Sequence, residues 1–119
     1  MKPTWPIRLA EAAEQDYREI LHWTLANFGK RQARTYAKTV TNALHELAHG
    51  PAIIGVGRRE DIGAGIHTLH VARKGRKGRH LVVFRIDFSR GEHVIAVLRL
   101  LHDSMDLPQH LTAAPDSPA

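Results

Sequence analysis

The sequence predicts an α+β domain in which a helical hairpin packs on one face of a small, mainly antiparallel sheet, in the order strand, helix, helix, strand, strand, strand (β-α-α-β-β-β). Two runs rich in Val, Ile, Leu and Phe, at residues 79–88 and 93–101, flank a short polar segment that contains a glycine, which is typical of an antiparallel β-hairpin. Upstream, residues 10–28 and 30–49 carry apolar side chains at helical spacing, with Gly29 between them. Because so little chain joins the two helices, they must turn back on each other.

The length and composition are those of one ordinary globular domain. A chain of 119 residues can build one core, and we assign residues 1–111 to the domain and residues 112–119, which lack apolar content, to a disordered tail. Cysteine is absent, which excludes disulfides, thiolate metal sites and cysteine nucleophiles. No signal peptide or run of about 18 apolar residues occurs, so we expect a cytoplasmic protein without a membrane partner. The net charge of +5 and the pI of about 10.1 predict an acidic partner, either nucleic acid or an acidic protein segment.

The N-terminal half of the chain supplies an edge strand and both helices. Residues 5–9 are just long enough for such a strand. The first helix ends at Gly29 and the second at Gly50 and Pro51. Their apolar stripes, which a sheet should cover, are Ala13, Tyr17, Ile20, Leu21, Leu25 and Phe28 in the first helix and Ala33, Tyr36, Ala37, Val40, Leu44 and Leu47 in the second.

The C-terminal half supplies the remaining strands. Residues 52–65 hold four glycines and a charged run, which indicates a loop, with Ile53 and Ile54 tucked against the helices. Residues 66–72 predict a short strand. The last strand is apolar on both faces, so both faces should be covered. Strict alternation places Val94, Ala96, Leu98 and Leu100 on one face and Ile95, Val97 and Leu101 on the other.

One motif on the second helix matches a metal-binding pattern. His45, Glu46 and His49 fit the H-E-x-x-H pattern of zinc proteases. Helical periodicity points both imidazoles away from the apolar stripe, whereas a catalytic zinc lies in a cleft with a third protein ligand. With nine histidines in the chain, a chance match is the simpler interpretation. We predict a solvated helix end and no metal site.

Five cations crowd the turn that precedes the β-hairpin. Such a flexible basic turn can contact phosphate or an acidic partner without reading sequence, or it can be a solvated tip, and both interpretations remain open. No aromatic residue is interleaved, so base stacking is not expected. The five residues are Arg73, Lys74, Arg76, Lys77 and Arg79.

Two arginines interrupt otherwise apolar strands. Arg85 and Arg99 must reach an acidic partner such as Asp87 or emerge at an edge, because an unpaired buried charge is prohibitive. The alternative is that they line an open face of the sheet.

A charged segment follows the most apolar strand directly, and a segment that leaves a rigid strand is a common place for function. We predict a functional role for it, with its apolar members packed back on the domain and His102, Asp103 and Asp106 exposed. A histidine beside carboxylates can serve acid–base catalysis, and local capping and ion pairing are the alternative. The segment consists of His102, Asp103, Ser104, Met105, Asp106 and Leu107.

The sequence Val97-Leu98-Arg99-Leu100-Leu101-His102-Asp103-Ser104-Met105-Asp106-Leu107 is the most specific phrase of the chain. Weaker phrases are Ala12-Ala13-Glu14 with Asp16, Ile20 and Trp23-Thr24, then Phe28-Gly29 with Gln32-Ala33 and Tyr36, and Phe84-Arg85. Together they resemble the ParE branch of the RelE/ParE superfamily of bacterial toxins. The resemblance implies a type II toxin that inhibits DNA gyrase and is neutralised by a cognate antitoxin whose C-terminal segment wraps it. For such a toxin we expect residues 102–107 to bind the target and carry toxicity. Only through the antitoxin would it meet DNA.

The RelE branch, whose members are ribosome-dependent mRNA endonucleases, is the alternative from a different functional class. That branch resembles this fold but places an arginine where His80 stands here, and it has basic residues and a tyrosine after the last strand, where this chain has Asp103, Met105, Asp106 and Leu107. Without those cations the charge that develops on cleaved RNA would be unstabilised. We therefore expect a protein that is not an enzyme and uses no cofactor. A non-toxic co-repressor that binds DNA with its antitoxin is a third interpretation.

Overall fold

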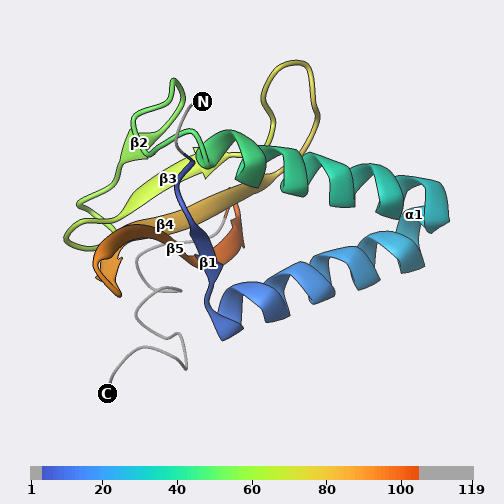
Figure 1. Ribbon diagram of the computed structural model, residues 1–119. Helices are drawn as coiled ribbons and strands as arrows, with labels where there is room; N and C mark the ends of the chain where they lie inside the picture. Colours follow the sequence, from blue (N-terminus) through green and yellow to red (C-terminus); the bar gives the residue numbers. More distant parts are fainter. Residues whose placement is uncertain (1–3, 105–119) are drawn as a thin grey trace.

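The computed structural model describes residues 4–104, which form one long helical element and five strands (Figure 1). The elements are β1 (Ile7–Leu9), α1 (Glu11–Leu47), β2 (Gly57–Arg58), β3 (His67–His70), β4 (His80–Ser89) and β5 (Glu92–His102). This arrangement confirms the predicted α+β class. Within the same residues, no helix combines the length and the hydropathy that crossing a membrane requires. The predicted tail, residues 112–119, lies outside the described part of the chain.

The element α1 is the predicted helical hairpin. Its helical geometry is broken at Gly29, where φ is 90° and ψ is 176°, values that only glycine adopts readily. The chain reverses there, so that residues 11–28 and residues 30–47 run antiparallel (Figure 1). We call these two pieces the first half and the second half of α1.

The sheet has the strand order β1-β5-β4-β3-β2. The strand β1 pairs with β5 in parallel, and the other three pairings are antiparallel, as a mainly antiparallel sheet requires. One expectation was wrong: the segment 52–65 is not entirely loop, because Gly57 and Arg58 pair with Thr68 and His67 to form the edge strand β2. Two short edge strands leave little backbone open to unwanted pairing.

The hairpin of β4 and β5 turns through Arg90 and Gly91, which have φ values of 51° and 79°. Positive φ at both central residues defines a type I′ turn, whose twist matches that of the strands it joins. Farther along, Phe84 pairs with Val97 and Val83 with Arg99, so Leu98 is an extra residue in β5 and forms a β-bulge.

The bulge corrects the predicted faces of β5. Strict alternation put Leu100 on the face opposite to Ile95 and Val97, but all three belong to one buried cluster on the side of α1. The extra residue Leu98 shifts the alternation by one position, and Leu98 and Leu101 pack in a second cluster on the other side. A bulge cannot be read from an apolar run because every position in the run is hydrophobic.

Both faces of β5 are mostly covered, as its sequence predicts. The larger core lies between the sheet and the base of α1, and its buried members are Ala13, Val40, Ala43, Leu47, Leu69, Val71, Val82, Phe84, Ile95, Val97 and Leu100. On the other face Ile62 and Ile66 cover Val83 and Leu101. The expectation for residues 53 and 54 was half wrong: Ile53 packs on the larger core, whereas Ile54 is exposed.

The sheet does not cover the whole apolar stripe of α1, contrary to the expectation from sequence. The hairpin of helices extends past the strands, and its distal end stands clear of them (Figure 1). Three side chains there are open to solvent, with exposed fractions of 59% for Trp23, 44% for Leu25 and 62% for Phe28. The helices are longer than the sheet they pack on, and this difference creates the site described next.

Candidate functional site

A cavity of about 1000 Å³ lies between the two halves of α1 and the beginning of β4. Its walls are mainly apolar near the tip of the hairpin, where Ile20, Trp23 and Phe28 contribute. Towards the sheet the lining becomes polar, with the basic turn on one side and His80 and His102 at the end. We call this cavity the hairpin groove.

Two exposed aromatic rings form the open end of the hairpin groove. Trp23 and Phe28 meet edge to face, with their ring centroids 5.6 Å apart. Each residue lies on the first half of α1, close to the reversal at Gly29. Aromatic side chains left this open are typical of a surface that another molecule covers.

The inner end of the hairpin groove holds a hydrogen-bonded pair that the sequence analysis did not single out. The Tyr36 hydroxyl accepts the backbone N–H of Arg79 at 3.2 Å and lies 2.6 Å from Nδ1 of His80. Which of the two groups donates the proton in this hydrogen bond depends on the tautomer of the His80 ring. Burial raises the pKa of Tyr36. Burial, with a smaller contribution from the charge of His102, lowers the pKa of His80 to about 4.

His102 and Asp103 lie beside this pair, but their environment differs from the prediction. Both were expected to be exposed, and both are half-buried because they are bonded to neighbouring strands and turns. Nδ1 of His102 accepts from the Ser104 backbone at 3.2 Å and lies 2.7 Å from its hydroxyl. Asp103 accepts from Nε2 of His70 at 2.9 Å and from Arg79 at 3.1 Å. These bonds from His70 and Arg79 lower the pKa of Asp103 to about 2.

The predicted C-terminal segment continues beyond the described part of the chain. Met105, Asp106 and Leu107 lie outside the described residues. What the structure brings together is therefore His102, Asp103 and Ser104 with His70 and His80. The pairing of β4 with β5 puts His80 opposite His102. This neighbourhood could not be predicted, because a strand that is apolar on both faces does not specify its register in the sequence.

The basic turn is folded onto the end of α1. The side chain of Glu46 is only 15% exposed. Its carboxylate forms ion pairs with Arg73 at 3.3 Å and Lys74 at 2.8 Å, and with Arg76. Burial alone would raise the pKa of Glu46, but the hydrogen bonds from Lys74 and Arg76 outweigh it and lower the pKa to about 2. The basic turn is therefore neither a flexible loop with free cations nor a solvated tip, because the carboxylate of Glu46 forms ion pairs with three of its five cations.

Two consequences follow for the residues predicted around this turn. Arg79 is paired with Asp103, so Lys77 is the one cation of the five without an ion partner within residues 4–104. The glutamate of the H-E-x-x-H match is the anchor of the turn. No group of three His, Asp or Glu in the described part of the chain is arranged to hold a metal ion.

Arg85 and Arg99 have separate acidic partners and are not brought together. Arg85 bonds Asp87 at 2.8 Å on the exposed side of β4. Arg99 forms a two-point contact with Asp16 of α1, at 2.7 and 2.9 Å. The same carboxylate accepts a hydrogen bond from the backbone N–H of Leu100 at 2.9 Å. This N–H has no partner in β1, because β1 pairs only with residues 95–97 of β5. The sequence contains one sign of this role: Asp16 is a carboxylate within the apolar stripe of its helix, between Ala13 and Ile20.

Comparison with known proteins assigns the family. The family profile described as "ParE toxin of type II toxin-antitoxin system, parDE" matches residues 7–107. The chain belongs to the ParE toxin family. It is 28% identical over 107 residues to Toxin ParE1 of Caulobacter vibrioides, covering 89% of this chain and 97% of the relative. It is 32% identical over 104 residues to Toxin ParE1 of Mycobacterium tuberculosis (strain ATCC 25618 / H37Rv), covering 87% and 94%.

A solved structure supports the fold. The YoeB/ParE toxin from Agrobacterium tumefaciens superposes with a TM-score of 0.54 at 15% sequence identity, covering 82% of this chain and 97% of that one. The family assignment confirms the resemblance drawn from the C-terminal phrase. This chain is therefore a ParE-family toxin of a type II toxin–antitoxin system.

The chemistry available at the inner end of the groove is limited. His80 is neutral near pH 7 and its Nδ1 is occupied by Tyr36. Arg79, the cation nearest to these rings in sequence, is neutralised by Asp103. Cleavage of a phosphodiester needs both a poised acid or base and cations that stabilise the developing charge.

Proposed function

We propose that this ParE-family toxin acts by binding and not by catalysis, that its free form inhibits DNA gyrase, and that a segment of its cognate antitoxin neutralises it by occupying the hairpin groove. The observation that carries the proposal is the groove itself, with Trp23 and Phe28 exposed on a single domain. Open apolar surface of this kind is stabilised when a partner covers it.

The lining of the groove specifies the chemistry of the antitoxin segment. Ile20, Trp23 and Phe28 require apolar side chains from the partner. The opposite rim is formed by Arg76, Lys77 and Arg79, and Lys77 has no ion partner within the described residues. An amphipathic segment with an apolar side and carboxylates along one edge fits both, since such segments commonly dock in apolar grooves.

Two observations support gyrase as the target. The sequence resembles the ParE branch, and His80 is a neutral ring bonded to Tyr36 whose neighbouring cation Arg79 is paired with Asp103, which does not favour RNA cleavage. The test uses the purified chain with purified gyrase. We expect the toxin to block supercoiling or to trap cleaved DNA, and we expect messages to remain intact on translating ribosomes. Cleavage of ribosome-bound message with no effect on gyrase would establish the endonuclease alternative instead.

Neutralisation by the antitoxin has a separate test. A small protein with an acidic segment, encoded beside the toxin gene, should bind the chain and raise its melting temperature, because a ligand of the folded state adds RT ln(1 + [L]/Kd) to its stability. Growth arrest by the toxin alone, relieved by that partner, separates an active toxin from a co-repressor that binds DNA without toxicity. An unchanged melting temperature with the partner in excess would refute this part of the proposal.

A further inference from the structure

A row of cations lies on the outer face of the second half of α1. Lys30, Arg34 and Lys38 recur every four residues, so their side chains line one face of the helix, and Arg31 lies next to them. All four are exposed. From Lys30 to Lys38 the row extends about 12 Å along the helix at 1.5 Å per residue. We call these four residues the basic ridge.

The basic ridge differs from the other cationic groups of the molecule because its charges are unpaired. Within residues 4–104 no acidic side chain forms an ion pair with any of the four. Most of the basic turn, by contrast, is paired with Glu46 or Asp103, and Arg99 is paired with Asp16. Unpaired like charges in a row repel one another, and an acidic partner relieves that repulsion.

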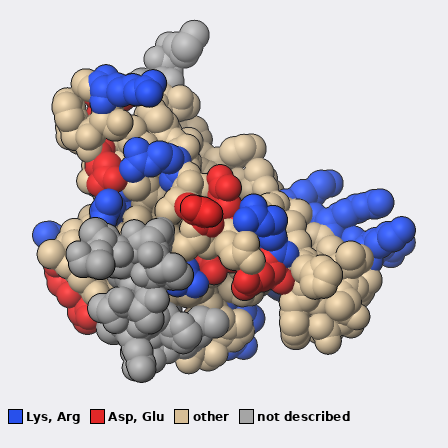
Figure 2. All heavy atoms as spheres, turned by 90° about the horizontal axis from the view of Figure 1, so that it is seen from below, with Lys and Arg blue, Asp and Glu red and all other residues tan. Residues whose placement is uncertain are grey.

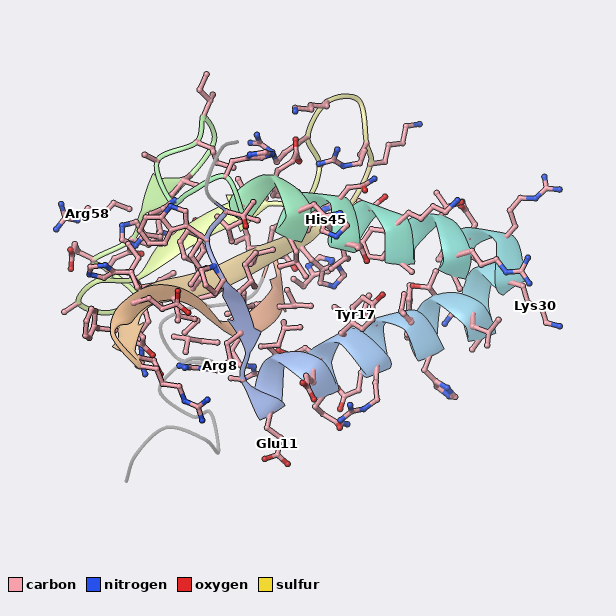
Figure 3. The ribbon with its side chains drawn as sticks, in the orientation of Figure 1. Arg8, Glu11, Tyr17, Lys30, His45 and Arg58 are labelled. Atoms are coloured by element: carbon pink, nitrogen blue, oxygen red, sulfur yellow. The ribbon has the colours of Figure 1, made fainter. Side chains whose placement is uncertain are left out.

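The position of the basic ridge makes it accessible. Lys and Arg side chains project together from one end of the molecule, clear of the rest of the surface (Figure 2). Lys30 lies at the far end of the helical hairpin, on the opposite side of the molecule from Arg58 (Figure 3). The first half of α1 carries most of the acidic residues of the hairpin, including Glu11, Glu14 and Glu19, so the two halves differ in charge.

The residues around the ridge indicate what kind of acidic partner it fits. The same exposed face continues with Asn42 and His45, which are polar. Protein interfaces are centred on buried apolar or aromatic side chains, and this face offers none, whereas the exposed aromatics of the hairpin line the groove. Lys, Arg and Asn on a projecting helix are the side chains that contact phosphate and sugar oxygens.

We propose that the basic ridge binds the phosphate backbone of duplex DNA directly and without sequence preference. An α-helix fits the major groove of B-DNA, and a cationic row along it can follow the phosphates. This inference goes beyond the proposed function: it concerns a surface separate from the hairpin groove and would hold with gyrase absent. It differs from the expectation that the family meets DNA only through its antitoxin. If the toxin inhibits gyrase, this contact would make it bind more tightly to gyrase that holds DNA than to gyrase alone.

The test compares two double variants that remove the same charge. Arg34→Gln with Lys38→Gln alters the ridge, and Arg58→Gln with Arg90→Gln is the control at exposed positions on the sheet. Glutamine is a good helix former, so the helix should persist, and circular dichroism melting verifies this. Binding of the full chain, without gyrase or antitoxin, to a fluorescent DNA duplex of about 20 base pairs is followed by anisotropy across a salt series.

If four phosphates are contacted, log K should fall with log[salt] at a slope of about −3.6 for the wild type and about −1.8 for the ridge variant, with the ridge variant binding on the order of a hundredfold more weakly at about 50 mM salt. The control should bind with the slope of the wild type. Restoring charge with Arg34→Lys and Lys38→Arg should restore binding.

Two results would overturn the proposal. One is equal loss of DNA binding in the ridge variant and the control, which would mean that net charge alone is responsible. The other is wild-type binding to a fluorescent polyglutamate peptide that is as tight as binding to the duplex and is lost in the ridge variant, which would identify an acidic protein as the partner. In both cases gyrase inhibition would be unaffected, so this failure is distinguishable from failure of the proposed function.

Discussion

The base and the tip of the helical hairpin carry the same apolar pattern and have opposite surroundings. At the base, Ala13, Val40 and Leu47 are fully buried against the sheet. At the tip, Leu25 and Phe28 continue the stripe but stand open to solvent. The periodicity of the helix therefore supports folding where the sheet lies beneath it and, in the proposed function, binding where the sheet has ended. Substitutions at the two ends should separate these purposes.

The largest effect is expected at the base, at Asp16. Its carboxylate accepts hydrogen bonds from Arg99 and from the backbone N–H of Leu100, and both of these contacts are lost when it is removed. Asp16→Ala should lower the free energy of unfolding by about 3 to 5 kcal/mol, the usual cost of breaking a buried ion pair on one side. Urea denaturation measures it. Pairing Asp16→Leu with Arg99→Met should recover part of the loss, and a single Asp16→Ala variant as stable as the wild type would mean that the contact does not anchor the hairpin.

A matched pair of leucines compares the base with the tip directly. Leu47→Ala removes a fully buried side chain and should cost about 2 to 5 kcal/mol through lost burial and a cavity. Leu25→Ala should cost at most about 0.5 kcal/mol, because its side chain is exposed. Chemical denaturation of both variants provides the measurement. Similar costs at the two positions would show that the tip is part of the core and not a binding surface.

A smaller effect, visible as pH dependence, is expected where the groove meets the sheet. The folded chain holds the pKa of His80 at about 4, against 6.5 for an ordinary histidine. Between those values the unfolded chain binds a proton at this ring and the folded chain does not, so stability should fall as the pH is lowered from 6.5 to 4. Glu46 and Asp103, each with a pKa of about 2, lose their contributions only at lower pH, as pH falls from their ordinary values towards 2.

Denaturation at pH 7 and pH 5 checks the contribution of His80. His80→Gln should reduce the difference in stability between the two pH values, whereas His22→Gln, on an exposed part of α1, should leave it unchanged. A loss of stability at pH 5 that is the same in the wild type and in His80→Gln would assign it to other groups.

The features predicted correctly from the sequence are those that local patterns encode. The helical hairpin with its reversal at Gly29, the strands β4 and β5 with the glycine-containing turn between them, and the mainly antiparallel sheet all follow from spacing and turn residues. The C-terminal phrase identified the family because its order of residues is specific.

The features that were missed depend on where distant segments meet. The bulge at Leu98 is invisible in an apolar run, and it determines which face Leu100 covers. Periodicity shows that Phe28 is on the apolar side of its helix but not that the sheet ends before reaching it. The binding of three cations to Glu46, and of Asp16 to Arg99, joins residues that are far apart in the chain, so neither charge cluster could be interpreted without the fold.

The claim that the tip of the hairpin is a binding surface has a direct test in two phenylalanines. Phe28 and Phe88 are exposed to similar extents, 62% and 67%, and each meets one aromatic neighbour edge to face, Trp23 and His93 respectively. Only Phe28 lines the hairpin groove. The affinity of the purified antitoxin for each alanine variant, measured by isothermal titration calorimetry, decides the matter. Phe28→Ala should weaken binding by at least tenfold, about 1.4 kcal/mol, and Phe88→Ala should leave it unchanged. Equal affinities for the two variants would contradict the assignment of the groove as the antitoxin site.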